Sequence, residues 1–453
     1  MKLLRWFLFW LLLIGVLLLV QPDDSITPTF IQRADQLSAS LDYQLAADHL
    51  QVALLRQPWN VSARLRLADV LTAQRHYTET EQVLNEAERW GADRAEVEQR
   101  RAQLAEQNNQ FEVAAQHWQN VSALRPLDNE AYASAVGAAL KAEQWAAARL
   151  IAEQWVTQTQ SPAAHFALAK IAALDDLAIA QDHFQHASGY AVQPFLSALQ
   201  ETDPALRALL LGRAFLAEND LTLAQRAFDE AVTLNPAYAE AQAFAGFVRD
   251  QRGADGSVWL DRAVQLDPNL IVARYFRARH RWMRADLDGA FADLNYAIER
   301  DPTNALIAAE LGRVYTQRGD FLNAEKWLNK ARDLKAQDVA IWKSLAELYV
   351  GRSFGTVDQA VTTAQQIVAL APEDAEAHLW LGRAYLRSGD RNAAESELKE
   401  AVRLNPQAAL AHFYLGRLYD RNTEAGRAAY ERAILLDPTG PIGMAAQRAL
   451  SLP

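Results

Sequence analysis

Residues 375–406 read AEAHLWLGRAYLRSGDRNAAESELKEAVRLNP, and this stretch decides the fold. Its apolar and small residues recur at the 3.6-residue period of a helix on both sides of Gly389-Asp390, which interrupts the pattern. Pro406 ends the second helix because proline has no N–H to donate. The stretch therefore predicts two amphipathic helices joined by a tight turn. The facing positions are Leu381, Gly382, Tyr385, Ala394, Leu398 and Ala401.

A single hairpin of this kind cannot bury its own apolar face, so copies are expected on each side. The pattern recurs at residues 205–236, 305–336 and 409–438, with a shorter turn in the last of these. Prolines close most copies at intervals of 32 or 34 residues, or of 70, which spans two copies. They are Pro236, Pro268, Pro302, Pro372, Pro406 and Pro438.

This pattern resembles the tetratricopeptide repeat family, in which Leu-Gly, an aromatic residue, alanines and a closing proline recur in about 34 residues. The resemblance covers nearly all of the chain after residue 22. It implies an all-α solenoid, a right-handed superhelix of tandem helical hairpins. It also implies a scaffold that holds a segment of a partner protein in a concave groove.

Composition excludes several other classes of function. The net charge of −11 argues against a nucleic-acid-binding surface, which needs a basic face. The absence of cysteine excludes disulfides, zinc fingers and thiol catalysis. The chain has no phosphate-binding loop, no Gly-x-Ser-x-Gly and no His-Glu-x-x-His motif, and the repeats leave no room for a catalytic domain. We therefore expect no enzyme activity, no cofactor and no metal.

Residues 1–22 predict an N-terminal transmembrane anchor. Residues 3–20 are apolar except for Arg5, and as a helix they would span about 27 Å, close to the thickness of a bilayer. A cleaved secretion signal is the alternative, although small residues are missing at the cleavage position. Lys2 and Arg5 precede the span and Asp23 and Asp24 follow it, so we expect a cytoplasmic N-terminus and an extracytoplasmic repeat array, or a secreted chain after cleavage.

The rest of the chain divides by how well the repeat pattern is kept. Residues 23–187 form a degenerate array, and residues 188–204 read as an insertion or hinge with Pro194 and Pro204. The well-defined array covers residues 205–438, where residues 339–372 carry a turn lengthened by about two residues. Residues 439–453 predict a capping helix over the last repeat. About twelve hairpins are expected in total.

Two histidines and six tryptophans have simpler interpretations than a ligand site. His183 and His186 are one helical turn apart, but no third or fourth ligand is evident, so we expect solvated histidines rather than a metal site. The tryptophans lie mostly at positions that predict burial between hairpins. They are Trp118, Trp155, Trp259, Trp327, Trp342 and Trp380.

Arginines are the candidate functional residues. Arg274–Arg284 holds five arginines and no acid. The family resemblance implies that Arg277 pairs with Asp293, sixteen positions later on the second helix, as an internal brace. It also implies that the arginine after the small residue of each first helix faces the groove, where a planar guanidinium suits a carboxylate. These positions are Arg213, Arg279, Arg313, Arg383 and Arg417.

One observation limits this interpretation of the arginines, and one alternative stays open. Glu347 takes the same position in residues 339–372 and breaks the row. Solvated or structural roles, with pairing to acids of the neighbouring copy, are the alternative. The expected function is a membrane-tethered scaffold for protein–protein interaction, with cell-envelope assembly as the setting suggested by similar bacterial arrays. The alternatives are an anion or small-ligand receptor that uses Arg274–Arg284, and an accessory subunit of a glycan-transfer or export enzyme.

Overall fold

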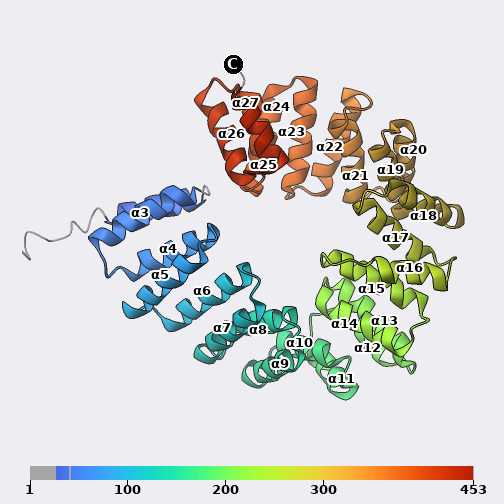
Figure 1. The fold of residues 1–453 in the computed structure, drawn as a ribbon, viewed down its shortest axis with the longest axis horizontal. Helices are drawn as coiled ribbons and strands as arrows, with labels where there is room; N and C mark the ends of the chain where they lie inside the picture. Colours follow the sequence, from blue (N-terminus) through green and yellow to red (C-terminus); the bar gives the residue numbers. More distant parts are fainter. Residues whose placement is uncertain (1–26, 40–41, 452–453) are drawn as a thin grey trace, which may run out of the picture. The chain divides into compact units, whose positions relative to one another are not determined.

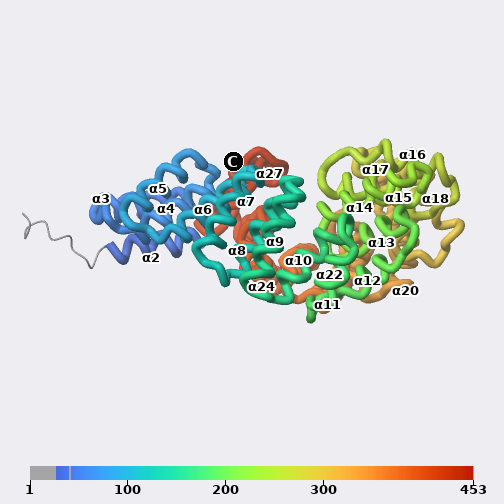
Figure 2. The backbone as a smooth tube through the Cα atoms, turned by 90° about the horizontal axis from the view of Figure 1, so that it is seen from below, coloured from blue at the N-terminus to red at the C-terminus, as the bar shows by residue number. Residues whose placement is uncertain are grey.

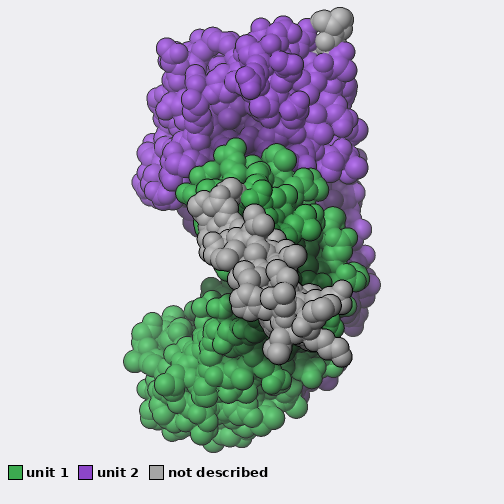
Figure 3. Space-filling view, turned by 90° about the vertical axis from the view of Figure 1, so that its left-hand side faces the viewer, with its two compact units in different colours: residues 1–227 green, residues 228–453 purple. Residues whose placement is uncertain are grey.

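The computed structural model describes residues 27–39 and 42–451, and these form helices and turns without a strand. The predicted anchor at residues 1–22 lies outside the described residues. Among the helices that are described, none combines the length and the apolar character needed to cross a bilayer. The chain divides into two compact units, residues 1–227 and 228–453, which Figure 3 colours green and purple. The boundary falls within helix α14 (Leu221–Leu234).

Unit 1 is a series of helical hairpins (Figure 1). The pairs are α2 (Thr27–Ala39) with α3 (Tyr43–Arg56), α4 (Val61–Ala73) with α5 (Tyr77–Arg89), α6 (Arg94–Gln107) with α7 (Phe111–Leu124), α8 (Asn129–Lys141) with α9 (Trp145–Thr159), and α10 (Pro162–Ala172) with α11 (Leu177–His186). α12 (Gln193–Leu199) and α13 (Pro204–Ala217) follow. α12 lies in the predicted insertion and buries Phe195, so this segment carries a packed helix; its role as a hinge stays a prediction.

Unit 2 is also a series of helical hairpins. The pairs are α15 (Ala239–Gln251) with α16 (Ser257–Leu266), α17 (Ile271–Met283) with α18 (Leu287–Arg300), α19 (Ala305–Arg318) with α20 (Phe321–Leu334), α21 (Val339–Ala346) and the π-helical turn η1 (Glu347–Gly351) with α22 (Val357–Leu370), α23 (Ala375–Ser388) with α24 (Arg391–Leu404), and α25 (Ala409–Tyr419) with α26 (Glu424–Leu436). α27 (Pro441–Ser451) packs on α25 and α26, where the sequence predicts a cap.

Within each unit every helix packs mainly on its neighbours in the chain, as Figure 2 also shows. In unit 2 the first helices of successive hairpins also contact one another, as α17 with α19 and α19 with α21. They therefore form a continuous surface, which we call the first-helix face. This is the solenoid arrangement that the repeats predict. The right-handed winding stays a prediction.

The close approach of paired helices depends on glycine. A Cβ atom on Gly382 of α23 would lie 2.7 Å from Leu398 Cγ of α24, and one on Gly312 of α19 would lie 2.5 Å from Leu328 Cγ of α20. Leu398 and Leu328 are completely buried. The leucine of the second helix thus occupies the space that a side chain on the first helix would take, which is the packing that residues 375–406 predict.

Local signals set the ends of these helices. Asp374 accepts a hydrogen bond from Glu376 N at 2.9 Å, and Asp390 accepts one from Ala393 N at 3.0 Å, so each caps the helix that follows it. Gly389 ends α23 with φ +85°, a conformation that glycine adopts without steric cost.

The lengthened turn in residues 339–372 takes a form that the sequence did not predict. Part of the insertion lies within the first helix as the π-helical turn η1, and residues 352–356 form the connecting loop. Arg387 of the following hairpin donates hydrogen bonds to four carbonyl oxygens of this region, those of Tyr349, Ser353 (3.2 Å), Phe354 (3.4 Å) and Gly355 (2.8 Å). One guanidinium therefore satisfies acceptors that the irregular backbone leaves without partners.

His378 and His412 occupy the same register in adjacent repeats, yet their surroundings differ. Each ring contacts the carbonyl oxygen of a closing proline, Pro372 at 2.9 Å and Pro406 at 3.0 Å. The other nitrogen of His378 lies 2.6 Å from Glu397 Oε2. Two oxygen acceptors require two N–H donors, so the geometry around His378 favours the imidazolium.

The same contacts explain opposite pKa shifts. Burial lowers the pKa of His378, but the bonds to Glu397 and to the Pro372 carbonyl outweigh it, and the pKa is raised above 6.5. Burial also lowers the pKa of His412; the Pro406 carbonyl opposes this only in part, and Arg432 adds to the lowering.

Replacing Gly382 by alanine should destabilise the α23–α24 hairpin. The clash with Leu398 costs about 1–3 kcal/mol, which exceeds the gain of up to about 1 kcal/mol in helix propensity. Gly137 in α8 is the control, because a Cβ atom there has no neighbour within 4 Å. Gly137→Ala should stabilise its hairpin by about 0.5–1 kcal/mol. Amide hydrogen exchange measures both, and equal effects at the two sites would contradict this account of the packing.

Titration of the ring protons by NMR should give His378 a pKa above 6.5 and His412 a pKa below it. Glu397→Gln should lower the His378 value and leave His412 unchanged. Because the folded pKa of His378 is raised, its stabilising contribution is complete below about pH 6.5 and is lost as the pH rises through the folded value. Hydrogen exchange in α23 and α24 should increase over that range, and an increase of the same size in the Glu397→Gln chain would exclude His378 as its cause.

Candidate partner-binding pocket

A pocket of about 420 Å³ lies on the first-helix face of unit 2. Its lining comes from the first helices of four successive hairpins, α17, α19, α21 with η1, and α23, together with Arg352 in the loop after η1. We call it the first-helix pocket. It is lined by Trp282, Arg313, Thr316, Gln317, Ala340, Lys343, Ser344, Glu347, Arg352, Glu376 and Trp380.

Two tryptophans from different repeats contribute the aromatic surface of the pocket, and each is covered by an arginine. The guanidinium carbon of Arg313 lies 4.4 Å from the centre of the Trp282 ring, and that of Arg383 lies 4.2 Å from the Trp380 ring. These are cation–π distances. Trp380 is 7% exposed, so it is buried as predicted and also lines the pocket.

The charges of the first-helix pocket are paired. Lys343 Nζ lies 2.7 Å from Asp374 and 2.5 Å from Glu376. Burial lowers the pKa of Lys343, but the bonds to the two carboxylates outweigh this effect. The pKa is therefore raised above its usual value, and the amine is charged. Glu347 pairs with Arg352 at 3.2 Å. The pocket therefore presents both positively and negatively charged groups, and it has no excess of positive charge.

Four of the five arginines predicted to line a groove fall into two neighbouring pairs. Arg279 and Arg313 are brought together by Glu310, at 3.9 and 3.2 Å. Arg383 and Arg417 lie over the same Tyr414 ring, at 5.1 and 5.4 Å.

The remaining arginine of that set, Arg213, is exposed on α13 of unit 1. Of the five, only Arg313 lines the first-helix pocket. Glu347, which breaks the row in the sequence, lines it as well. Ligand binding by the set stays a prediction.

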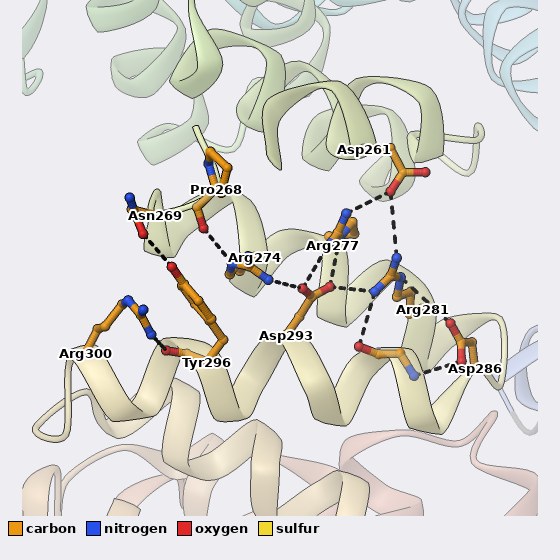
Figure 4. A network of polar contacts seen from close by, with 11 residues as sticks. Asp261, Pro268, Asn269, Arg274, Arg277, Arg281, Asp286, Asp293, Tyr296 and Arg300 are labelled. Carbon is orange, nitrogen blue, oxygen red and sulfur yellow. Dashed lines mark hydrogen bonds and ion pairs between the residues drawn. The ribbon is translucent and has the colours of Figure 1, made fainter. Parts of the chain in front are cut away.

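Arg277 forms the expected ion pair with Asp293, through two hydrogen bonds of 2.8 and 2.7 Å (Figure 4). Asp293 is 1% exposed, and two further arginines reach it, Arg274 at 2.9 Å and Arg281 at 2.8 Å. Asp261, on the preceding hairpin, pairs with Arg277 at 3.1 Å. The carboxylate of Asp293 is thus the centre of a charge network that joins α17, α18 and α16.

This network accounts for most of the basic segment Arg274–Arg284. Arg274, Arg277 and Arg281 all turn toward Asp293, as Figure 4 shows, and Arg274 also donates to the Pro268 carbonyl at 2.8 Å. Arg284 is 61% exposed and lies 3.7 Å from Asp255. The segment is therefore largely an internal structural element, which weakens its interpretation as an anion receptor.

Of the two histidines expected to be solvated, His186 is exposed and His183 is not. The side chain of His183 is 18% exposed rather than solvated, because His165 of α10 packs against it with the Nδ1 atoms 2.8 Å apart. Burial lowers the pKa of both rings. The sequence does not indicate that His165 joins them, since it is 18 residues from His183 in the chain and the contact depends on the register of the hairpin.

Sequence reasoning also missed most of the pocket lining. Trp282, Lys343 and Arg352 carried no motif, and Trp380 was assigned only to the core. The sequence did contain a signal for these pocket residues, because they lie in or next to the first helices of consecutive repeats. Their pairing partners could not be found from the sequence, because Asp374 and Glu376 belong to the next repeat.

Comparison with known families addresses the repeats directly. Residues 282–348 and 353–418 match the tetratricopeptide repeat family. The two matched segments together make up less than a third of the chain. They include most of the first-helix pocket, so the pocket lies largely within the matched segments. No curated protein matches the sequence.

Solved structures with a similar fold are distant in sequence. The Cut9–Hcn1 hetero-tetramer of the APC/C is 15% identical over 96% of this chain and 99% of that chain, with a TM-score of 0.46. Yeast Tom70 is 15% identical over 94% and 95%, with a TM-score of 0.39. A tetratricopeptide repeat protein from Parabacteroides merdae is 16% identical over 54% and 97%, with a TM-score of 0.42. Similarity at this level does not indicate what this chain binds.

Replacing Asp293 by asparagine should destabilise the α17–α18 hairpin by about 3 kcal/mol, because three guanidinium groups lose their buried counter-charge. Asp261→Asn is the matched control. That carboxylate is 51% exposed, so its loss should cost about 0–1 kcal/mol. Denaturant unfolding and hydrogen exchange in α17 and α18 measure the difference. A similar small loss for both variants would show that Asp293 is not the centre of the network.

Proposed function

We propose that the chain is a scaffold that binds an extended segment of a partner protein in the first-helix pocket. The observation that carries the proposal is the composition of this pocket, whose lining comes from four consecutive tetratricopeptide repeats. A ligand that contacts all four must be elongated along the repeats. A polypeptide segment meets this requirement, and helical repeat arrays use such surfaces to hold segments of other proteins.

The chemistry of the lining favours a peptide over a simple anion. The polar groups include the hydroxyl of Ser344, the amide of Gln317 and the paired charges of Lys343 with Glu376. A peptide backbone offers donors and acceptors at regular intervals, and its side chains can contact Trp282 and Trp380. An anionic ligand would instead require positive charge without a counter-ion, whereas Arg313, Lys343 and Arg352 each have a carboxylate partner.

We also propose that residues 1–22 tether this scaffold to a membrane, with the repeats outside the cytoplasm. The apolar run at residues 6–20 and the two basic residues before it support this arrangement. A tethered repeat array with no catalytic motif suits the assembly of a cell-envelope complex, including one that contains a glycan-transfer or export enzyme as a partner.

The experiment places a photo-crosslinking amino acid at Ser344, in the first-helix pocket, or at Lys326, which is exposed on the second helix α20. In native cells the Ser344 probe should capture a defined partner, and the Lys326 probe should not. The captured peptide, identified by mass spectrometry, should lose its crosslink when Trp282 and Trp380 are both replaced by alanine, provided that hydrogen exchange shows an intact α23. Equal capture from both positions would contradict a pocket-specific partner.

The tether is tested separately in the same cells. The full chain should stay with the membranes after an alkaline wash, and a chain that begins at Asp23 should be released. A chain beginning at Asp23 that stays with the membranes would contradict the tether without affecting the pocket result.

A further inference from the structure

Three of the nine histidines of the chain gather in one hairpin of unit 1. His165 lies on α10, and His183 and His186 lie on α11. The His165 ring centre is 5.0 Å from that of His183 and 5.1 Å from that of His186. With helices of 11 and 10 residues, this is the shortest of the paired hairpins in the described part of the chain.

The contact between His165 and His183 places an electron pair between the rings. Their Nδ1 atoms are 2.8 Å apart, so at least one of the two carries no proton; two N–H groups would repel each other at this distance. His165 is 8% exposed and the side chain of His183 is 18% exposed, so both nitrogens are largely shielded from water. The other ring donates its Nδ1–H across the contact. When that proton moves to Nε2 of the same ring through solvent, both Nδ1 atoms present an electron pair at one point and form half of a tetrahedral metal site.

His186 is prepared to act as a third ligand. Its Nδ1 lies 2.9 Å from the carbonyl oxygen of Asp182 and donates a hydrogen bond to it. In the neutral ring this bond fixes the tautomer in which Nε2 has the free electron pair, which is the orientation that metal-binding histidines commonly have. The ring is on the surface. Rotation about its side-chain bonds can direct Nε2 toward the other two rings, and this exchanges the hydrogen bond to Asp182 for a bond to the ion.

We propose that His165, His183 and His186 bind a dication of the zinc type, which holds α10 and α11 together. Imidazole nitrogen suits Zn²⁺, Co²⁺, Ni²⁺ and Cu²⁺. Bonds of about 2.0–2.1 Å at a tetrahedral angle separate two nitrogens by about 3.3 Å, so the His165–His183 pair must open by about half an ångström. Water or the Asp182 carboxylate, 4.0 Å from His183 Nδ1, takes the fourth position.

A second group, Asp250, Asp255 and His280, also brings ligand atoms within 4.8 Å of one another, but its geometry is that of an ion-pair network. Nδ1 of His280 faces both oxygens of Asp250, at 2.9 and 3.0 Å, while Nε2 faces Asp255. Asp250 Oδ1 also accepts from Gly256 N. The ring and the Asp250 carboxylate are thus already paired with groups of the protein itself, and we assign no ion to this cluster.

The test uses the full chain, purified in detergent without a polyhistidine tag. Titration with Co²⁺ should give the visible absorption of a tetrahedral site at one ion per chain, and Zn²⁺ should displace it. His186→Ala, which changes an exposed side chain, should weaken Co²⁺ binding by at least about tenfold. His183→Ala should abolish it. His76→Ala, which removes a histidine on another hairpin, should leave it unchanged.

Unfolding of the variants is controlled by circular dichroism and by hydrogen exchange in α10 and α11. Zn²⁺ should slow exchange in these two helices in the unmodified and His76→Ala chains, because an ion that binds only the folded hairpin stabilises it. It should have no such effect in the His183→Ala chain. The absence of stoichiometric Co²⁺ binding to the unmodified chain, or binding that survives His183→Ala, would overturn the proposal.

Discussion

The close contact between a glycine on one helix and a leucine on the next is the constraint on which the hairpins α19–α20 and α23–α24 depend. Gly382 against Leu398 and Gly312 against Leu328 bring the axes of each hairpin together. The first helix of a hairpin also contacts the first helix of the next hairpin, as α17 contacts α19. The first-helix face, and with it the pocket between Trp282 and Trp380, follows from that spacing.

The charged side chains of these repeats mainly form ion pairs that join neighbouring helices. Asp293 is buried with three arginines around it, Arg279 and Arg313 share Glu310, and Lys343 lies between two acids. Such pairs specify which side chains meet, whereas the apolar contacts supply most of the stabilisation. A binding surface built this way is polar yet nearly neutral. It suits a partner that offers both signs of charge and apolar side chains at intervals.

The fold was predictable from the sequence because the residues that determine the packing of each hairpin lie within that hairpin. The period, the glycines and the closing prolines are local, so residues 375–406 were enough to predict their hairpin. Arg277 with Asp293 could be predicted since both lie in one repeat at a family spacing. Contacts between repeats could not, because the partners of Lys343 and the neighbour of His183 depend on register in three dimensions. The π-helical turn at residues 347–351 was missed because an insertion can extend either a helix or a loop.

Arg387 makes the structure of one repeat depend on the repeat that follows it. Its guanidinium contacts four carbonyl groups of the preceding repeat, at Tyr349, Ser353, Phe354 and Gly355. The irregular segment thus takes its shape from a residue encoded some thirty positions later. Tandem repeats are often treated as interchangeable modules that can be duplicated, deleted or shuffled. Here residues 339–372 and 375–406 would have to be inherited, and transplanted into other arrays, as a single cassette.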